Sequence, residues 1–303
     1  MDIAVLLIQQ NIVMLIYMAV GFFLFKTKIV DNTGSAQLGK MVLYIVMPSA
    51  IINSYIKEFS EEAFVGFLLS FFAALAALVL AIIISRLSFK KYPVEHFGAA
   101  FSNAGFIGIP LVQATIGGEA VFYVASFVAL LNILQWTYGL LVFTGDKSRI
   151  TVKALATNPI VISLVIGLAL FFTSFEPPAL VRGALTTIAS MNGPLAMIVL
   201  GIYAAQLPLK TIFTSKLAYA STVIRLVVIP LASLALFSLI PAEYYVMKIT
   251  LLIAAAAPIG SNVAIFAQLT GNDYAQSVKD ICLSTIFCIV TMPAIMALAG
   301  LVW

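Results

Sequence analysis

An uninterrupted apolar run from Phe64 to Ser85 is the feature that most constrains this chain. The run contains no charged residue, and similar runs recur, so that 63% of the 303 residues are apolar and only 9% are charged. One soluble core could not bury this much hydrophobic surface, whereas a helix of roughly 20 apolar residues spans a bilayer. Barrel strands would alternate over about ten residues instead of running continuously. The sequence therefore predicts an all-α membrane protein.

Charged or Gly/Pro-rich breaks divide the chain into ten candidate transmembrane helices. These predicted helices cover residues 3–25, 37–55, 63–85, 94–115, 119–143, 155–174, 179–205, 217–240, 246–269 and 274–300. With their loops they use the whole length, which leaves no room for a separate soluble domain. The chain begins Met-Asp-Ile without a basic leader, so the first helix is expected to be retained rather than cleaved.

The basic residues predict which side of the membrane each loop occupies. If the N-terminus lies outside, the inside loops hold twelve Lys and Arg residues, and the outside loops hold three, Lys57, Arg182 and Lys248. Cytoplasmic loops carry an excess of Lys and Arg. We therefore expect a protein of the plasma membrane with both termini extracytoplasmic. The basic residues are scattered singly and form no stripe, so no nucleic-acid partner is expected.

Matched glycines and prolines indicate two halves of five helices. Gly21 is matched by Gly167 and Pro48 by Pro194, each pair 146 residues apart. Because five is odd, the second copy enters the membrane from the opposite face, and the repeat is inverted. We predict a first repeat at 1–145, a cytoplasmic linker at 146–154 and an inverted second repeat at 155–303. Chance recurrence of Gly and Pro in apolar sequence is the alternative explanation.

The fourth and ninth predicted helices carry helix breakers at mid-membrane depth. The fourth reads Ser-Asn-Ala-Gly-Phe-Ile-Gly-Ile-Pro over 102–110, and the ninth reads Pro-Ile-Gly-Ser-Asn over 258–262. Proline removes a backbone donor, glycine loosens the backbone, and Ser or Asn can cap the helix that restarts. A broken helix in hydrocarbon persists only where protein or water satisfies its polar groups. Crossed, broken helices 4 and 9 would thus build one shared site near the midplane, unless the breakers are simple packing kinks.

The chemistry expected at this site follows from the helix ends. The restarting halves would bring two positive ends together, which favours an anion, while carbonyls of the first halves could hold a cation. The register is open, because Pro110 to Pro258 gives an offset of 148 and Asn103 to Asn262 gives 159. The candidate substrate-binding residues are Ser102, Asn103, Gly105, Pro110, Arg225, Pro258, Ser261 and Asn262.

Three ionisable residues lie in or near the predicted helices. Arg225 lies about 13 Å inside the eighth helix, where an arginine costs at least about 2.5 kcal/mol and needs a partner. It is expected either to balance an anionic substrate or to tether carbonyls of a broken helix. Asp280 is the best acidic candidate for coupling transport to an ion gradient. An interfacial ion pair with Lys279 is nevertheless the favoured interpretation. His96, at a loop edge, is expected to be solvated.

Motifs for catalysis, nucleotide binding and metal binding are absent from the sequence. It contains no His-Glu-x-x-His pair and no phosphate loop, so we expect no enzyme, no cofactor and no metal site. Cys282 and Cys288 lie six residues apart in one helix and cannot form a disulfide. Without an ATP site, any transport must be passive or driven by a gradient.

The interrupted segments resemble the auxin efflux carrier family, the PIN-like group of secondary transporters, in a bacterial-type form. The resemblance rests on residues 102–110, on Gly-Gly-Glu-Ala at 117–120 and on Ala-Pro-Ile-Gly-Ser-Asn at 257–262, and it covers essentially the whole chain. It implies ten helices in two inverted five-helix repeats, with helices 1, 2, 6 and 7 as a scaffold, often dimeric. Helices 3–5 and 8–10 would form a transport domain that moves as an elevator. Asn103 and Asn262 would contact a small organic anion.

Together these features predict a secondary active or facilitative transporter, most simply an exporter, of a small organic anion such as a dicarboxylate or auxin-like carboxylate. A homodimer and coupling to protons or sodium are expected. The sequence departs from plant members of the family in its short linker and in a third helix without charged residues. The alternatives are a sodium-coupled organic anion symporter of the bile-acid type, a channel and, least favoured, a membrane-embedded enzyme.

Overall fold

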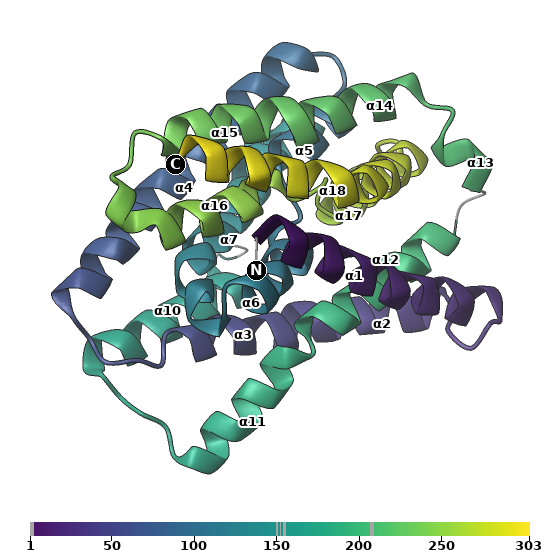
Figure 1. Ribbon diagram of the computed structural model, residues 1–303. Coiled ribbons are helices and arrows are strands. Elements are labelled where there is room, and N and C mark those ends of the chain that lie inside the picture. Colours follow the sequence, from purple (N-terminus) through teal and green to yellow (C-terminus); the bar gives the residue numbers. More distant parts are fainter. Residues whose placement is uncertain (1–2, 150, 152, 154–155, 207–208) are drawn as a thin grey trace.

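The computed structural model describes residues 3–149, 151, 153, 156–206 and 209–303, and these residues form a bundle of helices (Figure 1). Their one isolated extended pairing joins Ser102 and Ile259 in an antiparallel bridge. Six of the described helical segments are long and apolar enough to cross a membrane: Asn32–Ser54, Glu61–Ser88, Gly118–Thr144, Ala179–Ala205, Lys216–Phe237 and Tyr274–Val302. Shorter apolar helices cover Ile12–Lys26, Ala104–Thr115 and Pro159–Thr173.

The first half of the chain matches the predicted helices closely, with the second and fifth each built from consecutive helical segments. The first predicted helix is α1 (Ile3–Lys26) and the third is α4 (Glu61–Ser88). The second comprises α2 (Asn32–Met41), η1 (Val42–Val46) and α3 (Met47–Ser54). The fourth comprises α5 (Pro93–Ala100), η2 (Ala104–Gly108) and α6 (Ile109–Thr115). The fifth comprises η3 (Gly118–Ala120), α7 (Val121–Leu134), η4 (Gln135–Gly139) and α8 (Leu140–Thr144), and η5 (Lys147–Arg149) follows.

The second half repeats this order with different interruptions. The sixth and seventh predicted helices are α10 (Pro159–Thr173) and the pair α11 (Ala179–Ser190) and α12 (Asn192–Ala205), followed by the short α13 (Leu209–Ile212). The eighth is α14 (Lys216–Val223), η6 (Ile224–Val228) and α15 (Ile229–Phe237), followed by η7 (Ala242–Tyr244). The ninth is α16 (Tyr245–Ala256) and α17 (Asn262–Thr270), and the tenth is α18 (Tyr274–Val302). Ile150, Val152 and Ala154 of the predicted linker, and Leu155 at the predicted start of the sixth helix, lie outside the described residues.

Polar residues in the loops set where five of these helices begin. Asp31, Ser60, Asn158, Ser215 and Asp273 each accept a hydrogen bond from a backbone N–H in the first turn that follows. Such caps satisfy donors that a helix cannot satisfy itself. These caps fix the first residues of the five helices next to the polar loop segments from which the helix boundaries were predicted.

Three prolines are accommodated by a wide turn directly before them. The π-type turns η1, η2 and η6 end two residues before Pro48, Pro110 and Pro230, respectively. Proline lacks an N–H and its ring collides with the preceding turn, and one extra residue in that turn relieves both problems. These helices therefore continue through their prolines.

Two helix pairs approach closely through glycine. A Cβ at Gly21 of α1 would lie 2.0 Å from the carbonyl oxygen of Ile198, and one at Gly201 of α12 would lie 1.9 Å from that of Met18. On the other pair, a Cβ at Gly167 of α10 would lie 2.9 Å from the ring of Tyr55, which follows α3. Only glycine permits such contact between helix backbones. Helix 1 thus packs on helix 7, and helix 6 packs on the end of helix 2.

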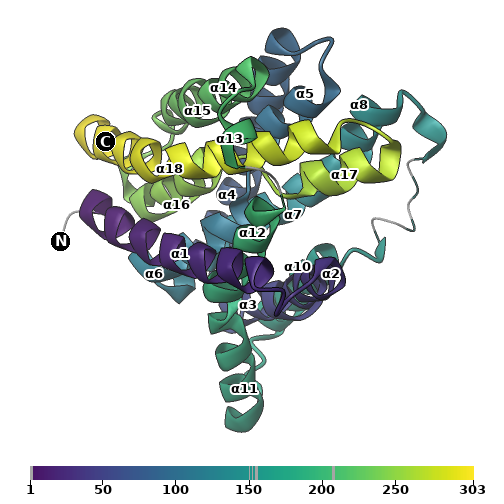
Figure 2. The ribbon, with the colours of Figure 1, turned by 90° about the vertical axis from the view of Figure 1, so that its right-hand side faces the viewer.

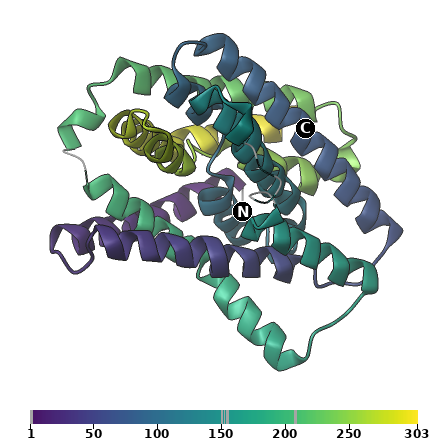
Figure 3. The ribbon, with the colours of Figure 1, turned by 180° about the vertical axis from the view of Figure 1, so that it is seen from behind.

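Several connections that are predicted for opposite sides of the membrane lie on opposite sides of the bundle. In Figure 1 the connections α1–α2 and α13–α14, which carry Lys26, Lys28 and Lys216, lie on the right, whereas α3–α4, α10–α11 and α15–α16 lie on the left. Helix α11 projects from the body of the bundle, as Figure 3 also shows from behind. Lys248 does not lie in an outside loop as predicted, because it belongs to α16, where its Nζ donates to Ile240 O at 3.3 Å and lies 4.4 Å from the centre of the Trp303 ring.

The glycine contact between α1 and α12 generates a stability prediction. Gly201→Leu should lower the free energy of unfolding by about 3 kcal/mol, because the added side chain meets a fixed backbone carbonyl. The measurement is the midpoint of thermal unfolding in detergent, with the folded yield by size exclusion. Gly183→Leu in α11 is the matched control, since a Cβ there meets nothing within 4 Å. Equal midpoints for the two variants would contradict the packing described.

Candidate binding site at the two helix breaks

Helices 4 and 9 are both interrupted, and their breaks meet. The helical backbone stops after Ala100 in one and after Ala256 in the other. Between the breaks, Asn103 N donates to Pro258 O at 2.7 Å, and Gly260 N donates to Phe101 O at 3.1 Å. Each extended segment thus satisfies backbone groups of the other, which is the condition for a helix break inside a membrane.

These two hydrogen bonds pair the breaks in a register that was not predicted from the sequence. They exchange under a local twofold that relates Ser102 to Ile259, an offset of 157 residues. This differs from both offsets considered from the sequence. In this register Asn103 corresponds to Gly260, so Asn262 lies two residues further along its own segment, and Pro110 has no counterpart in Pro258.

Arg225 contributes the remaining donors at the breaks. Its side chain is only 1% exposed, and its guanidinium donates to Ala99 O at 3.1 Å and to Ala100 O at 3.3 Å. It donates as well to Ala255 O on the other broken helix. Carbonyls at the end of a helix lack partners within that helix, and Arg225 therefore tethers the ends of α5 and α16 to each other. Arg225 was expected either to balance an anionic substrate or to tether the carbonyls of a broken helix. The observed contacts are those of the tether.

A small cavity of about 30 Å³ lies against the crossing. It is lined by Leu43, Met47, Ser102, Asn103, Gly105, Phe106, Leu131, Asn132, Gln135, Gly260, Ser261 and Asn262. Asn262 Nδ2 donates to Gln135 Oε1 at 2.7 Å, and Asn132 Nδ2 donates to Val128 O at 2.8 Å. Ser102 Oγ and Asn103 Nδ2 are buried without a hydrogen-bond partner. Buried polar atoms of this kind are available to a ligand.

A second cavity of about 510 Å³ adjoins the first and shares Leu43, Phe106, Ser261 and Asn262 with it. Its other lining residues are Asn32, Ser35, Ala36, Gly39, Lys40, Tyr203, Gln206, Ala264, Ile265, Gln268, Tyr274, Val278 and Ile281. Among these described residues Lys40 carries the only charge. A cavity with several amide and hydroxyl groups and one exposed cation favours an anion with hydrogen-bonding oxygens.

The predicted capping of the restarted helices is wrong. Asn103 and Ser261 occupy the N-cap positions of η2 and α17, but neither makes a side-chain hydrogen bond to the helix that follows. The positive helix ends therefore face the crossing without a side-chain cap. Backbone N–H groups at such an end bind anions.

The eight predicted site residues fall into two groups in the structure. Five line the small cavity: Ser102, Asn103, Gly105, Ser261 and Asn262. The other three hold the site instead of lining it. Pro258 accepts the bond from Asn103, Arg225 tethers carbonyls, and a Cβ at Gly193 of α12 would lie 3.2 Å from Pro110.

Sequence reasoning missed the contribution of the fifth helix and of Lys40. Asn132 and Gln135 lie three residues apart and reach the crossing from α7 and η4. The signal was present, because two amides in an otherwise apolar run are unusual in a membrane. Lys40 was counted only as a marker of topology.

Two expectations about ionisable residues are wrong. His96 is buried, and its Nε2 lies 3.2 Å from Tyr138 Oη. Asp280 is fully buried and forms no ion pair with Lys279, and it accepts a hydrogen bond from Gln276 Nε2 at 2.8 Å. The two cysteines are free, as expected, and both are buried.

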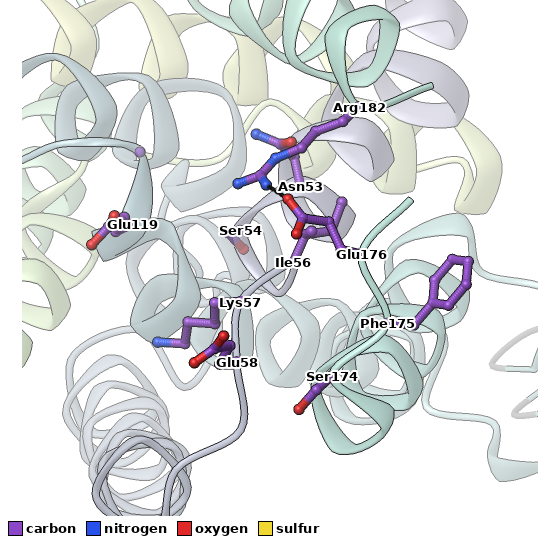
Figure 4. Close-up of a pocket in the computed structure, with 11 residues that line it drawn as sticks. Asn53, Ser54, Ile56, Lys57, Glu58, Glu119, Ser174, Phe175, Glu176 and Arg182 are labelled. Carbon is purple, nitrogen blue, oxygen red and sulfur yellow. Dashed lines mark hydrogen bonds and ion pairs between the residues drawn. The ribbon is translucent and has the colours of Figure 1, made fainter. Parts of the chain in front are cut away.

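A separate cavity of about 480 Å³ (Figure 4) is lined by residues of the α3–α4 and α10–α11 connections, which lie opposite the α1–α2 connection in Figure 1. Arg182 and Glu176 pair at one edge, and Lys57 lies beside Glu58 at another, with Glu119 farther along the lining. Lys57 Nζ lies 3.6 Å from the centre of the Phe122 ring. Burial lowers the pKa of Lys57, and the Glu119 carboxylate partly offsets this shift. This mixed charge distinguishes the cavity from the one that contains Lys40.

Comparison with known proteins shows the family. A family model described as "Membrane transport protein" matches the chain twice, over residues 6–154 and 147–296. The chain belongs to this family. The assignment confirms the resemblance to the auxin efflux carriers, and it makes the chain a multi-pass membrane transporter and not an enzyme. The two matches meet at the predicted linker, which supports the repeat.

Relatives in this family cover most of the chain. A protein of Rhizobium meliloti (strain 1021) named "Putative malonate transporter" is 24% identical over 288 residues, which is 89% of this chain and 89% of the relative. An uncharacterized transporter of Methanocaldococcus jannaschii is 25% identical over 296 residues, which is 93% of this chain and 95% of the relative. These transporters thus span both halves of the fold.

The tether formed by Arg225 can be tested by substitution. Arg225→Gln should lower the free energy of unfolding by about 3 kcal/mol or more, because three buried carbonyls lose a charged donor. Arg225→Lys should fall between this variant and the parent, since an ammonium reaches fewer carbonyls than the guanidinium fork. Thermal unfolding in detergent measures both. A parent-like midpoint for Arg225→Gln would argue against the tether.

Proposed function

We propose that this protein is a secondary transporter of a small organic anion, with a dicarboxylate such as malonate as the substrate class. The observation that carries the proposal is the crossing of two broken helices, with unpartnered Ser102 and Asn103 atoms beside a cavity whose only charge is Lys40. The name of the Rhizobium relative supports the dicarboxylate. Carboxylate oxygens match the amide, hydroxyl and backbone donors at this crossing.

The proposed architecture has ten transmembrane helices in two inverted repeats, residues 1–145 and 155–303. The double family match and the local twofold at the crossing support the repeat. The packing of helix 1 on 7 and of helix 6 on the end of helix 2 supports a scaffold of helices 1, 2, 6 and 7. Helices 3–5 and 8–10, which contain the crossing, form the transport domain and move as an elevator against it.

The proposed orientation places the cavity with Lys40 on the cytoplasmic side and both termini outside the plasma membrane. The grouping of loops in Figure 1 and the excess of inside lysines support this orientation. A membrane potential that is negative inside drives anions outward, at roughly 2.3 kcal/mol per charge and 100 mV. Uncoupled transport of an anion would therefore run as export.

A homodimer is part of the proposal. Helix α11 projects from the bundle, and its apolar residues Leu180 and Val181 are exposed. A projecting helix with exposed apolar side chains can pack against the same helix of a second copy. Such a dimer would fix the scaffold while each transport domain moves.

The transport proposal is tested with purified protein in liposomes. Exchange of radiolabelled malonate against internal malonate should be saturable and should not require sodium. Asn103→Ala and Asn262→Ala should each reduce exchange about 10- to 100-fold, because each removes an amide that faces the crossing. Asn272→Ala, outside both cavities, is the matched control.

The outcomes separate the alternatives. Parent-like exchange in both crossing variants would contradict the assigned site. Strict sodium dependence would favour a symporter of the bile-acid type, and single-channel currents far above carrier turnover would favour a channel.

Lys40 provides a separate electrostatic test. Lys40→Ala should raise the malonate concentration for half-maximal exchange about fivefold, because a partly solvated charge contributes roughly 1 kcal/mol to anion binding. Added salt should narrow the difference between parent and variant, since it screens exposed charges. Lys210→Ala, on α13, is the control on the same side of the membrane. If Lys40→Ala leaves the half-maximal malonate concentration unchanged, Lys40 does not attract the anion.

A further inference from the structure

Two buried carboxyl groups beside the crossing take no part in the site described above. Asp280 of α18 is 0% exposed and Glu95 of α5 is 3% exposed. A Cβ at Gly98, one turn after Glu95, would lie 3.9 Å from Asp280 Oδ2 and 3.2 Å from Ile259 Cγ2. Helices α5, α14 and α18 pack together here (Figure 2). The Glu95 carboxyl is close enough to act electrostatically on Asp280.

One oxygen of the Asp280 carboxylate has a hydrogen-bond partner, and the other has none. Gln276 Nε2 donates to Asp280 Oδ1 at 2.8 Å. Asp280 Oδ2 is buried with no hydrogen-bond partner. Ser221 faces it from α14, but the Ser221 hydroxyl donates to Ala218 O at 3.0 Å. An unpartnered carboxylate oxygen in the interior is unfavourable.

No cation compensates the pair. Among the described residues, neither carboxyl forms an ion pair. Arg225 is held by carbonyls, and His96 faces Tyr138. The remaining charged groups on α5, on α18 and on the described elements that pack against them are Lys26, Glu61, Glu62, Arg86, Lys210, Lys216, Lys248, Lys279 and the capping residue Asp273. Of these, Asp273 is exposed and adds negative charge near both carboxyl groups.

A proton is the ligand that fits this arrangement. Two buried carboxylates without a counter-charge are strongly unfavourable, and one shared proton removes one charge and supplies the missing donor. A metal ion would need more ligands than the pair offers, and the described residues hold no group of three His, Cys, Asp or Glu side chains suited to a metal. The pair therefore takes up one proton.

The pair is connected to both the crossing and the cytoplasmic cavity. One turn after Asp280, Ser284 Oγ accepts a hydrogen bond from Ile259 N at 3.1 Å, within the bridged segment. On another face of α18, Tyr274, Val278 and Ile281 line the cavity that contains Lys40. A change of charge at Asp280 thus acts close to the anion site.

We propose that Glu95 and Asp280 form a proton-binding site that makes the carrier a proton–anion symporter. The proposal rests on the anion transport proposed above. A proton from one side adds to a carboxylate oxygen and leaves on the other side, and this O–H bond is the only bond formed or broken. Neutralising one carboxylate weakens repulsion of the substrate, so proton and anion favour each other's binding by the same factor. The co-transported proton offsets one charge of the anion against the membrane potential.

The transport test measures malonate uptake into liposomes that contain no malonate at the start. The membrane potential is clamped at zero, and the external pH is varied. For one proton per malonate, steady-state accumulation should rise about tenfold for each unit by which the outside is more acidic. Asp280→Asn should abolish this dependence while exchange at equal pH continues. Glu95→Gln should weaken it, and the double variant should match Asp280→Asn, because the two groups share one proton.

A second measurement does not depend on the substrate. Infrared spectra of the substrate-free protein, titrated with pH, should show the C=O stretch of a protonated carboxyl that Asp280→Asn removes. Asp273→Asn is the matched control, since asparagine caps α18 as well as aspartate does. If malonate is not exchanged but the band is present and specific to Asp280, the proposed substrate fails and the proton site stands.

Two results would overturn the proton site. One is malonate accumulation in the parent protein that does not respond to a pH gradient. The other is an infrared titration that Asp280→Asn leaves unchanged.

Discussion

The rest of this structure depends on how the backbone is satisfied where two helices stop inside the membrane. A helix end in hydrocarbon leaves carbonyl and amide groups that cost several kcal/mol each if they lack partners. Here Asn103 and Gly260 exchange hydrogen bonds with the opposite break, and Arg225 takes the carbonyls that precede them. One arginine thus holds together two segments that lie 155 residues apart at Ala100 and Ala255. Because Arg225 is engaged by these carbonyls, the proposed attraction for an anionic substrate is assigned to the helix ends and to Lys40.

The two basic residues near the crossing, Arg225 and Lys40, have different roles because one is buried and the other is exposed. Arg225 is sealed from water and is occupied by carbonyls, so it sets geometry. Lys40 stands in an open cavity, so it can raise the local concentration of anions without holding them tightly. Between the two lie neutral donors, among them Ser102 and Asn103, whose partners are missing. In the proposed function, neutral donors would release an anion more readily than a buried cation would.

Much of the fold could be predicted from the sequence, because hydrophobic runs, helix breakers and basic loops act locally. The helix ends at Asp31, Ser60 and Ser215 follow from loop chemistry. The breaks at 101–103 and 257–261 follow from the Asn, Pro and Gly that lie within them. The position of Arg225 could be predicted, but not its partners, because they come from two other helices. The register failed for the same reason: it depends on two hydrogen bonds across the crossing and not on matching residue types. His96 and Asp280 were misjudged because their burial is set by neighbouring helices that sequence distance does not reveal.

The register of the crossing carries a consequence for how the two membrane faces compare. The offset between the halves is 146 residues at Pro48 and Pro194 but 157 at Ser102 and Ile259, a gain of eleven residues in the second half. In that interval the second half holds α13, which packs on α18, whereas the first half has only the short turn between α3 and α4. A duplicated ancestor with equal halves would work identically from either face. In the proposed elevator mechanism the longer second half removes that equivalence, so the inward-facing and outward-facing states are expected to differ in free energy.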